Sequence, residues 1–221
     1  KAEVKDDRVR YINGDVCDYQ SLLHAFRDVD IIIHAAAYKS VSHGEYSPQE
    51  VVRVNVVGSI NVINAAIERG VKKVIALSSD KACNPVNTYG RSKGLMESVV
   101  TQANVYSHHS RFSCCRYGNV FGSSGSVIPL WEKQFTETGK IQITDPLMTR
   151  FFMTLDESVK LIMTAITLGK KGDTFIPIVK SGKVKDLAEI FAEKYGGKVK
   201  DIGIRPGEKI HEELINEEEL R

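Results

Sequence analysis

The chain has 221 residues, 42% hydrophobic and 26% charged, which suffices for one sizeable core and a small second lobe. Its 30 Lys and Arg residues nearly balance 28 Asp and Glu residues, and the formal charge of +2 argues against a surface dedicated to nucleic acid. The longest apolar stretches, around 29–37 and 74–77, are too short to cross a bilayer, and the polar start shows no signal peptide, so we expect a cytoplasmic protein without membrane contact.

Alternating strands and helices are predicted along the first half of the chain. A β-branched run such as 31–33 is typical of a strand buried on both faces of a parallel sheet. Ser47, Pro48 and Glu50 predict the capped start of a helix, and Gly70 predicts its left-handed end. The expected strands are 8–13, 30–34, 71–79 and 110–117, and the expected helices are 19–27, 48–69 and 89–106.

Shorter elements follow after residue 120. Thr154 and Glu157 predict a second capping box, and the apolar residues at 159, 162, 163 and 166 predict one buried face on the helix that follows. The other expected helices are 128–137 and 184–195, and the expected strands are 141–144, 174–178 and 199–204.

The four cysteines, Cys17, Cys83, Cys114 and Cys115, are predicted to be free thiols. Neighbouring residues on a strand point to opposite faces, so Cys114 and Cys115 are poorly placed to pair. No C-x-x-C motif is present, and the histidines show no ligand spacing, so no metal site is predicted.

The alternation of elements predicts an α/β fold with a Rossmann-type, doubly wound parallel sheet and a smaller C-terminal substrate-binding lobe. We expect residues 1–120 to form an NAD(P)-binding domain and residues 121–221 to form mainly the substrate lobe, with some elements returning to the core. Such folds open on a Gly-x-Gly-x-x-Gly turn, and none of the 17 glycines has that spacing. We therefore expect this chain to lack the first βαβ segment of the fold.

The segment from Ser78 to Lys93 carries the most specific chemical pattern. It begins where a buried strand ends, the edge at which open parallel sheets bind ligands. Tyr89 and Lys93 lie four residues apart on one helix face, and an ammonium beside a phenol lowers the pKa of the phenol, so Tyr89 is a candidate proton acceptor. A Tyr-x-x-x-Lys pair alone is common on solvated helix faces. Asp80 and Lys81 at the strand end favour the functional interpretation over a surface ion pair.

This segment, together with several others, resembles the extended short-chain dehydrogenase/reductase family. The similar stretches are 14–16, 34–37, 116–120, 125–129, 143–145, 148–151 and 203–209, together with Asn55. Within the family the chain is most similar to the inverting UDP-N-acetylglucosamine 4,6-dehydratases, which also carry Tyr at the position of Tyr89. Ser40, Ser42 and Ser124 depart from the pattern of these relatives.

The resemblance implies an NADP-dependent hydro-lyase, with NAD as the alternative cofactor, acting on UDP-N-acetylglucosamine in polysaccharide and pseudaminic-acid biosynthesis. It implies four catalytic residues, Asp80, Lys81, Tyr89 and Lys93. The implied cofactor-binding residues are Asp15, Val16, Ala35, Ala36, Ala37, Lys39, Asn55, Ser78, Tyr89, Lys93, Tyr117, Gly118, Asn119 and Val120. The implied substrate-binding residues are Lys39, Ser79, Asn119, Ser126, Val127, Thr149, Arg150, Arg205 and Glu208.

In the implied reaction Tyr89, helped by Lys93, removes the proton of the C4 hydroxyl while hydride passes from C4 to the nicotinamide. The resulting ketone acidifies the C5 proton, which Lys81 takes if burial leaves its amine partly neutral. Asp80 or Tyr89 protonates the departing C6 hydroxyl, and hydride returns to C6. The guanidinium groups of Arg150 and Arg205 suit the diphosphate.

Two other functions fit the same sequence. A UDP-sugar 4- or 5-epimerase of this fold would lack the elimination step, and Asp80 with Lys81 favours elimination. Alternatively, the absence of the glycine-rich turn leaves an inactive module that only binds nucleotide sugar. In each case we expect a homo-oligomer, a dimer or a hexamer, as the resemblance implies.

Overall fold

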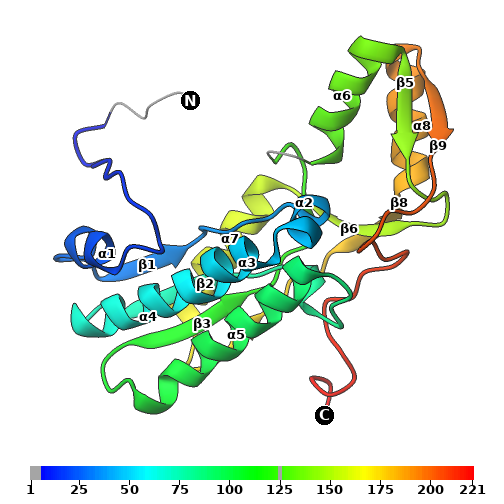
Figure 1. The fold of residues 1–221 in the computed structure, drawn as a ribbon. Coiled ribbons are helices and arrows are strands. Elements are labelled where there is room, and N and C mark those ends of the chain that lie inside the picture. The colour runs from blue at the N-terminus through cyan, green and yellow to red at the C-terminus, as the bar shows by residue number, and fades with distance from the viewer. Residues whose placement is uncertain (1–5, 124–125) are drawn as a thin grey trace.

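A parallel sheet forms the centre of the molecule (Figure 1). The computed structural model describes residues 6–123 and 126–221. The strand order of the sheet is β1-β2-β3-β7, and each neighbouring pair is parallel. These strands are β1 (Ile31–His34), β2 (Lys73–Leu77), β3 (Arg111–Cys115) and β7 (Thr174–Phe175). The predicted Rossmann-type α/β class is thereby confirmed.

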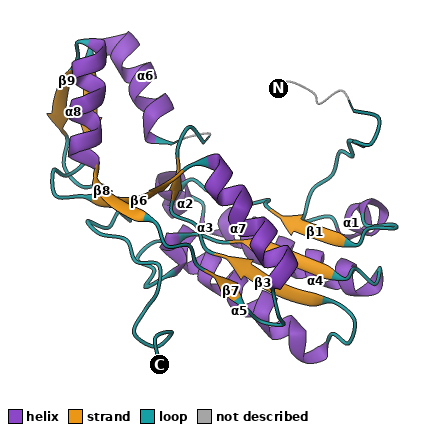
Figure 2. Cartoon of the chain, turned by 180° about the vertical axis from the view of Figure 1, so that it is seen from behind, coloured by secondary structure: helices purple, strands orange, loops and turns teal. Residues whose placement is uncertain are grey.

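Helices cover both faces of this sheet (Figures 1 and 2). Helices α4 (Gly58–Glu68) and α5 (Thr88–Tyr106) lie on one face, and α7 (Leu155–Leu168) lies on the other. The main apolar core fills the first interface and includes Val74 and Phe112, both almost completely buried. Burying one such side chain stabilises the fold by about 1.5–3 kcal/mol. The remaining helices of this half are α1 (Tyr19–Ala25), which packs on α4, α2 (Val41–Tyr46) and α3 (Pro48–Val52).

A second lobe has a core of its own. Trp131 is its largest fully buried side chain, and its indole N–H donates to the Gln142 carbonyl at 2.8 Å. The elements of this lobe are α6 (Val127–Thr138), α8 (Val184–Tyr195) and the parallel strands β5 (Lys140–Ile143) and β9 (Lys198–Asp201). A small sheet of β4 (Asn119–Val120), β6 (Thr149–Met153) and β8 (Lys180–Lys183) joins the lobe to the central sheet. The chain also returns to the central sheet through α7 and β7.

Several local predictions are confirmed. Gly70 has a φ of 68°, as its role at a helix end requires. Thr154 and Glu157 form the reciprocal capping box at the start of α7. All four cysteines are free, and Cys114 and Cys115 are both buried on β3.

Other local predictions are wrong. Residues 8–13 form no strand, although they are described throughout. Ser47 makes no side-chain capping bond, and the Glu50 carboxylate pairs with Arg53 instead of reaching back. On α7 the predicted apolar face is correct only in part, since Ile162 and Ile166 are half-buried, whereas Val159 and Met163 are exposed.

The helical run Pro48–Glu68 combines α3, a π-helical turn (Arg53–Val57) and α4. By length and composition it is apolar enough to cross a membrane, with a mean hydropathy of 1.3, yet half of it is buried within the molecule. Val62, Ala65 and Ala66 of this run belong to the main core, which is what the central helix of a globular domain does with such a sequence.

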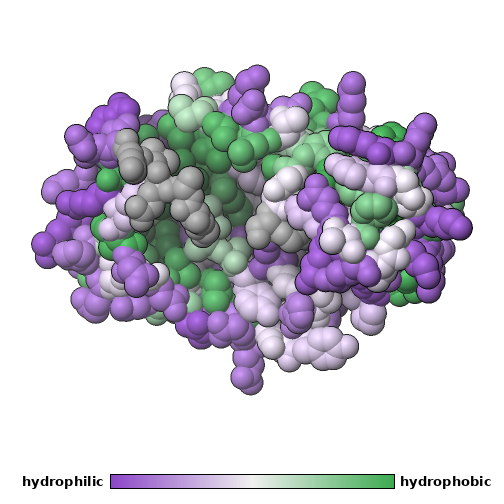
Figure 3. All heavy atoms as spheres, turned by 90° about the horizontal axis from the view of Figure 1, so that it is seen from above, coloured by the Kyte–Doolittle hydropathy of each residue, from purple (hydrophilic) through white to green (hydrophobic). Residues whose placement is uncertain are grey.

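Apolar side chains also gather on one exposed face. Seen from above, green side chains surround a hollow on the left half of the molecule, while the lobe on the right is mostly purple (Figure 3). The edge strand β1 lies on that left side and leaves Ile31 and Ile33 42% and 48% exposed. An edge strand with exposed isoleucines is unusual for an isolated sheet, because apolar strand edges are normally covered.

Candidate active site

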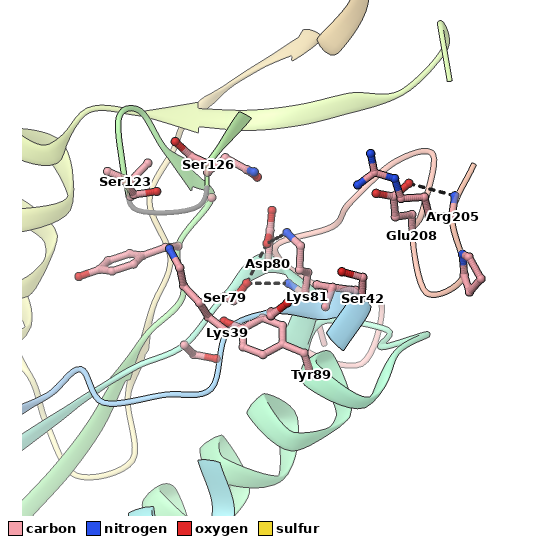
Figure 4. A pocket seen from close by; sticks show the side chains of 18 residues that line it. Lys39, Ser42, Ser79, Asp80, Lys81, Tyr89, Ser123, Ser126, Arg205 and Glu208 are labelled. Carbon is pink, nitrogen blue, oxygen red and sulfur yellow. Dashed lines mark hydrogen bonds and ion pairs between the residues drawn. The ribbon is translucent and has the colours of Figure 1, made fainter. Parts of the chain in front are cut away.

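A cavity of about 520 Å³ opens at the carboxyl ends of β2 and β3 (Figure 4). Open parallel sheets bind ligands at this edge, and the volume suits a small organic molecule. The cavity is lined by Lys39, Ser40, Val41, Ser42, Ser78, Ser79, Asp80, Lys81, Tyr89, Tyr117, Gly118, Asn119, Val120, Ser123, Ser126, Arg205, Pro206 and Glu208. The structure thus brings together most of the residues predicted to act on substrate or cofactor.

A short turn after β2 forms one wall of the cavity. The backbone pairing of β2 with β3 continues beyond the strands, since the Asp80 N–H donates to the Tyr117 carbonyl at 2.6 Å. The Ser79 hydroxyl caps the 3₁₀ turn (Asp80–Ala82) by accepting from the Lys81 N–H at 3.2 Å and donating to the Asp80 carboxylate at 2.9 Å. The same carboxylate oxygen accepts from Lys81 Nζ at 2.9 Å. This turn therefore presents a fixed ion pair to the cavity.

Tyr89 reaches the same place from the first turn of α5. The Asn87 side chain caps this helix, and Gly90 lets it approach the turn, because a Cβ at Gly90 would collide with the Lys81 carbonyl oxygen. Burial raises the pKa of Tyr89, and the Lys81 charge and a hydrogen bond with Ser79 only partly offset that rise. Tyr89 is therefore a protonated phenol in the resting protein, contrary to the expectation of a pKa near neutrality.

Lys93 lies behind this wall and does not line the cavity. Its ammonium is buried and donates to the Leu77 carbonyl at 2.7 Å. Burial lowers the pKa of Lys93 to about 8. The cation that acts on the Tyr89 hydroxyl is Lys81, which lines the cavity. Lys93 therefore does not act on the Tyr89 hydroxyl as predicted. It holds α5 against the end of β2 instead.

Lys81 is held between two carboxylates. Besides Asp80, the buried Glu212 lies 3.6 Å from Lys81 Nζ. Burial lowers the pKa of Lys81, but the two carboxylates outweigh it, and the net pKa is raised. The expectation that burial leaves Lys81 partly neutral is therefore not met in the resting protein.

Glu212 was missed by the sequence analysis, which ended the functional segment at Lys209. A signal for it exists in the alternation of Ile210, Glu212 and Leu214, since alternate residues of an extended segment share one face. Glu212 and Leu214 are indeed buried, and Glu213 between them is exposed.

The opposite rim of the cavity comes from the C-terminal segment. Arg205 and Glu208 face the turn across the cavity, and the Glu208 carboxylate accepts from the Arg205 backbone N–H at 3.2 Å (Figure 4). Ser126 and Lys39 approach from the other two sides. Ser40, Ser42 and Pro206 also line the cavity, whereas Ser124 and Gly125 lie outside the described residues.

Some predicted site residues lie elsewhere among the described residues. Arg150 is buried and its guanidinium donates to the carbonyls of Thr149, Lys209 and Ile210, so it fastens the C-terminal segment in place. Asn55 is buried, and its side-chain amide accepts from the Tyr38 N–H and donates to the Tyr38 carbonyl. These two bonds fix the loop after β1. The others that do not line the cavity are Asp15, Val16, Ala35, Ala36, Ala37, Val127 and Thr149.

The cavity wall holds polar atoms that have no hydrogen-bond partner among the described residues. They are buried, and they come from Ser78, Asp80, Tyr117, Asn119 and Ser126. Unpaired buried polar groups are costly, so their gathering at one cavity indicates a polar ligand that offers both hydrogen-bond donors and acceptors. A nicotinamide dinucleotide and a nucleotide sugar both fit that description.

The comparisons with known proteins agree with this chemistry. The family described as "Polysaccharide biosynthesis protein" matches residues 1–221. A UDP-N-acetylglucosamine 4,6-dehydratase (inverting) of Campylobacter jejuni is 46% identical over 214 residues, which cover 96% of this chain and 64% of that protein. A UDP-glucose 4-epimerase of Rickettsia akari is 41% identical over 221 residues, which cover 98% of this chain and 65% of that protein. The chain thus spans slightly less than two thirds of the length of these relatives.

A solved structure is similar throughout. The X-ray structure of Pen from Bacillus thuringiensis matches with a TM-score of 0.93 and 41% identity, covering 96% of this chain and 69% of that chain. The fold of the central sheet and the second lobe is therefore shared with an experimentally solved protein.

Proposed function

The chain belongs to the polysaccharide biosynthesis protein family, and from that membership we propose that it carries the catalytic centre of an inverting UDP-N-acetylglucosamine 4,6-dehydratase. The single observation that carries the proposal is the Asp80–Lys81 ion pair at 2.9 Å in the cavity wall beside Tyr89. Oxidation at C4 needs one proton acceptor, whereas elimination across C5 and C6 needs further groups that move protons. This cavity offers three such groups together.

The proton steps are divided between Tyr89 and Lys81, and Asp80 holds the Lys81 amine in place. Tyr89 as phenolate takes the proton of the C4 hydroxyl, and Lys81 as amine takes the C5 proton once the C4 ketone has formed. Tyr89 then returns its proton to the departing C6 hydroxyl, which leaves as water. Lys81 then loses its proton to solvent, and protonation of C5 by solvent on the opposite face inverts that carbon. Because the pKa values of Tyr89 and Lys81 are both raised, we expect turnover to increase with pH on the acid side.

A nicotinamide cofactor, NADP in our proposal, would supply the hydride chemistry that the reaction needs at C4 and C6. Ser78, Tyr117 and Asn119 would hold it, since their side chains line the cavity with unpartnered buried oxygens. Arg205 and Glu208 would hold the diphosphate and the ribose of the nucleotide sugar, because a guanidinium matches phosphate oxygens and a carboxylate accepts from hydroxyl groups. A cytoplasmic location and a homo-oligomeric state are further parts of the proposal.

A UDP-glucose 4-epimerase is the second candidate, because a relative with that name is almost as similar to this chain. Incubation of the protein with UDP-N-acetylglucosamine and nicotinamide cofactor, followed by mass spectrometry, separates the candidates. Loss of one water supports the dehydratase, and an isomer of unchanged mass supports the epimerase. Binding of the nucleotide sugar without any turnover would support the third alternative, an inactive module that only binds nucleotide sugar.

A further inference from the structure

The carboxylate of Glu212 sits in a place that many contacts determine. The preceding residues are fixed to β6, since the Thr149 N–H donates to the Ile210 carbonyl at 3.0 Å and its hydroxyl bonds the His211 ring at 2.8 Å. The following residues are fixed to the central domain, since Arg116 donates to the Leu214 carbonyl at 2.6 Å. A segment held on both sides has little freedom to move Glu212 away from Lys81.

The two oxygens of the Glu212 carboxylate each lie near a lysine, but neither distance is that of a short hydrogen bond. Glu212 Oε1 lies 3.6 Å from Lys81 Nζ, and Oε2 lies 3.8 Å from Lys209 Nζ. Oε2 is buried and has no hydrogen-bond partner among the described residues. Lys209 instead donates to the Cys83 carbonyl at 2.9 Å. An imperfectly paired buried carboxylate costs stability, so its retention calls for a role beyond holding the fold.

We propose that Glu212 is a positioning residue that, together with Asp80, fixes the location and the charge of the Lys81 amine at the cavity wall. Asp80 approaches Lys81 from its own turn, and Glu212 approaches from the C-terminal segment. The other charged or titratable groups that act on Lys81 or on Glu212 are Tyr89 from α5, Arg150 from β6 and Lys209. Burial raises the pKa of Glu212, and the neighbouring Lys81 charge offsets that rise only in part.

Loss of the Glu212 charge should release the Lys81 proton at lower pH. The first measurement is competitive acetylation of the folded protein with trace acetic anhydride at a series of pH values, read at Lys81 by mass spectrometry. In the wild type the Lys81 midpoint should lie above the usual lysine value of about 10.4. In Glu212→Gln it should fall by about one pH unit or more. Glu212→Asp keeps the charge at a greater distance and should give a smaller fall.

Glu213→Gln is the matched control, because the neighbouring Glu213 is exposed and bonds Asn84. It should leave the Lys81 midpoint as in the wild type. A wild-type midpoint at or below the usual lysine value, or an equal midpoint in Glu212→Gln and the wild type, overturns the proposal. The wild-type midpoint alone can overturn the proposal, even if the variants do not fold.

The effect on turnover rests on the proposed function and is measured separately. The acid limb of kcat for dehydration should move to lower pH in Glu212→Gln with little change in KM. A merely structural role would lower kcat without moving the limb. If the wild type shows no dehydration, the proposed function fails, while the acetylation result still judges the role of Glu212.

Discussion

The Arg116 guanidinium donates two hydrogen bonds, at 2.7 and 2.9 Å, to the carboxylate of Glu219, which lies 103 residues further along the chain. Arg116 is buried at the end of β3 and also binds the Glu97 carboxylate of α5 at 2.7 Å. One side chain thus joins the central sheet, a helix and the C-terminal segment that carries Glu212.

Arg116→Met should therefore destabilise the protein by about 3–5 kcal/mol, because it leaves the Glu97 carboxylate buried without a partner. The free energy of unfolding from urea titration measures this. Arg53→Met removes an exposed arginine with the same kind of carboxylate partner and should cost less than about 1 kcal/mol. Equal losses in the two variants would contradict the importance of burial.

Tyr89→Phe should abolish most turnover while the fold persists. The substitution removes only the hydroxyl, and positioned proton transfer typically contributes about 10²–10⁴-fold to a rate. Loss of water from the nucleotide sugar, followed by mass spectrometry, gives the rate, and circular dichroism gives the fold. Tyr106→Phe changes an exposed tyrosine at the far end of the same helix and should retain full activity. Undiminished turnover in Tyr89→Phe would remove the phenol from the mechanism.

Gly90→Ala tests how closely α5 must approach the turn at Lys81. The added Cβ collides with the Lys81 carbonyl oxygen and lies 3.1 Å from the Pro85 side chain, so either the helix or the turn must shift. We expect a loss of stability of about 1–3 kcal/mol and a fall in kcat as Tyr89 is displaced. Thermal unfolding and steady-state kinetics measure the two effects.

Gly94→Ala is the matched control one turn along the same helix. Its added Cβ lies at 3.4 Å from the Ala82 carbonyl, an ordinary contact, and alanine favours a helix over glycine by about 1 kcal/mol. This variant should be as stable as the wild type or more so. A similar destabilisation in both variants would indicate that the whole helix, rather than its first turn, is tightly packed.

The sequence predicts this fold well where local chemistry and packing agree. The buried run of β2 and the capping box at Thr154 have local causes, whereas β1 forms as a strand but is not buried on both faces as predicted, since Ile31 and Ile33 are exposed. It predicts poorly where long-range contacts decide, as for β6, which forms by pairing with β8. The same holds for the predicted strand at 8–13, which lacks a neighbouring strand among the described residues.

The candidate site divides in a similar way. Asp80, Lys81 and Tyr89 lie within a few residues of one strand end, so a motif reveals them. Arg150 has the chemistry of a phosphate ligand, but three carbonyls of the folded chain occupy its donors. Glu212 reaches Lys81 only because the chain between them folds back, so the alternation along 210–214 can indicate that Glu212 is buried but not that Lys81 is its partner.

The buried amine of Lys93 should make stability depend on pH in a specific direction. Its pKa is about 8 in the folded protein, where burial disfavours the charge, against 10.5 for an ordinary lysine. Between these values the unfolded chain binds more protons than the folded one, so stability should rise with pH through that window. One pKa unit corresponds to about 1.36 kcal/mol, which makes the full contribution on the order of 3 kcal/mol.

Lys93→Met removes this group, and the difference in unfolding free energy between wild type and variant isolates its contribution from other titrations. Urea titrations at pH 7, 8, 9 and 10 should show the wild type gaining on the variant above about pH 8. Lys160→Met, on the exposed side of α7, should leave the pH dependence as in the wild type. A constant difference between wild type and Lys93→Met at all four pH values would mean that the Lys93 amine keeps its proton throughout, held by the Leu77 carbonyl at 2.7 Å despite its burial.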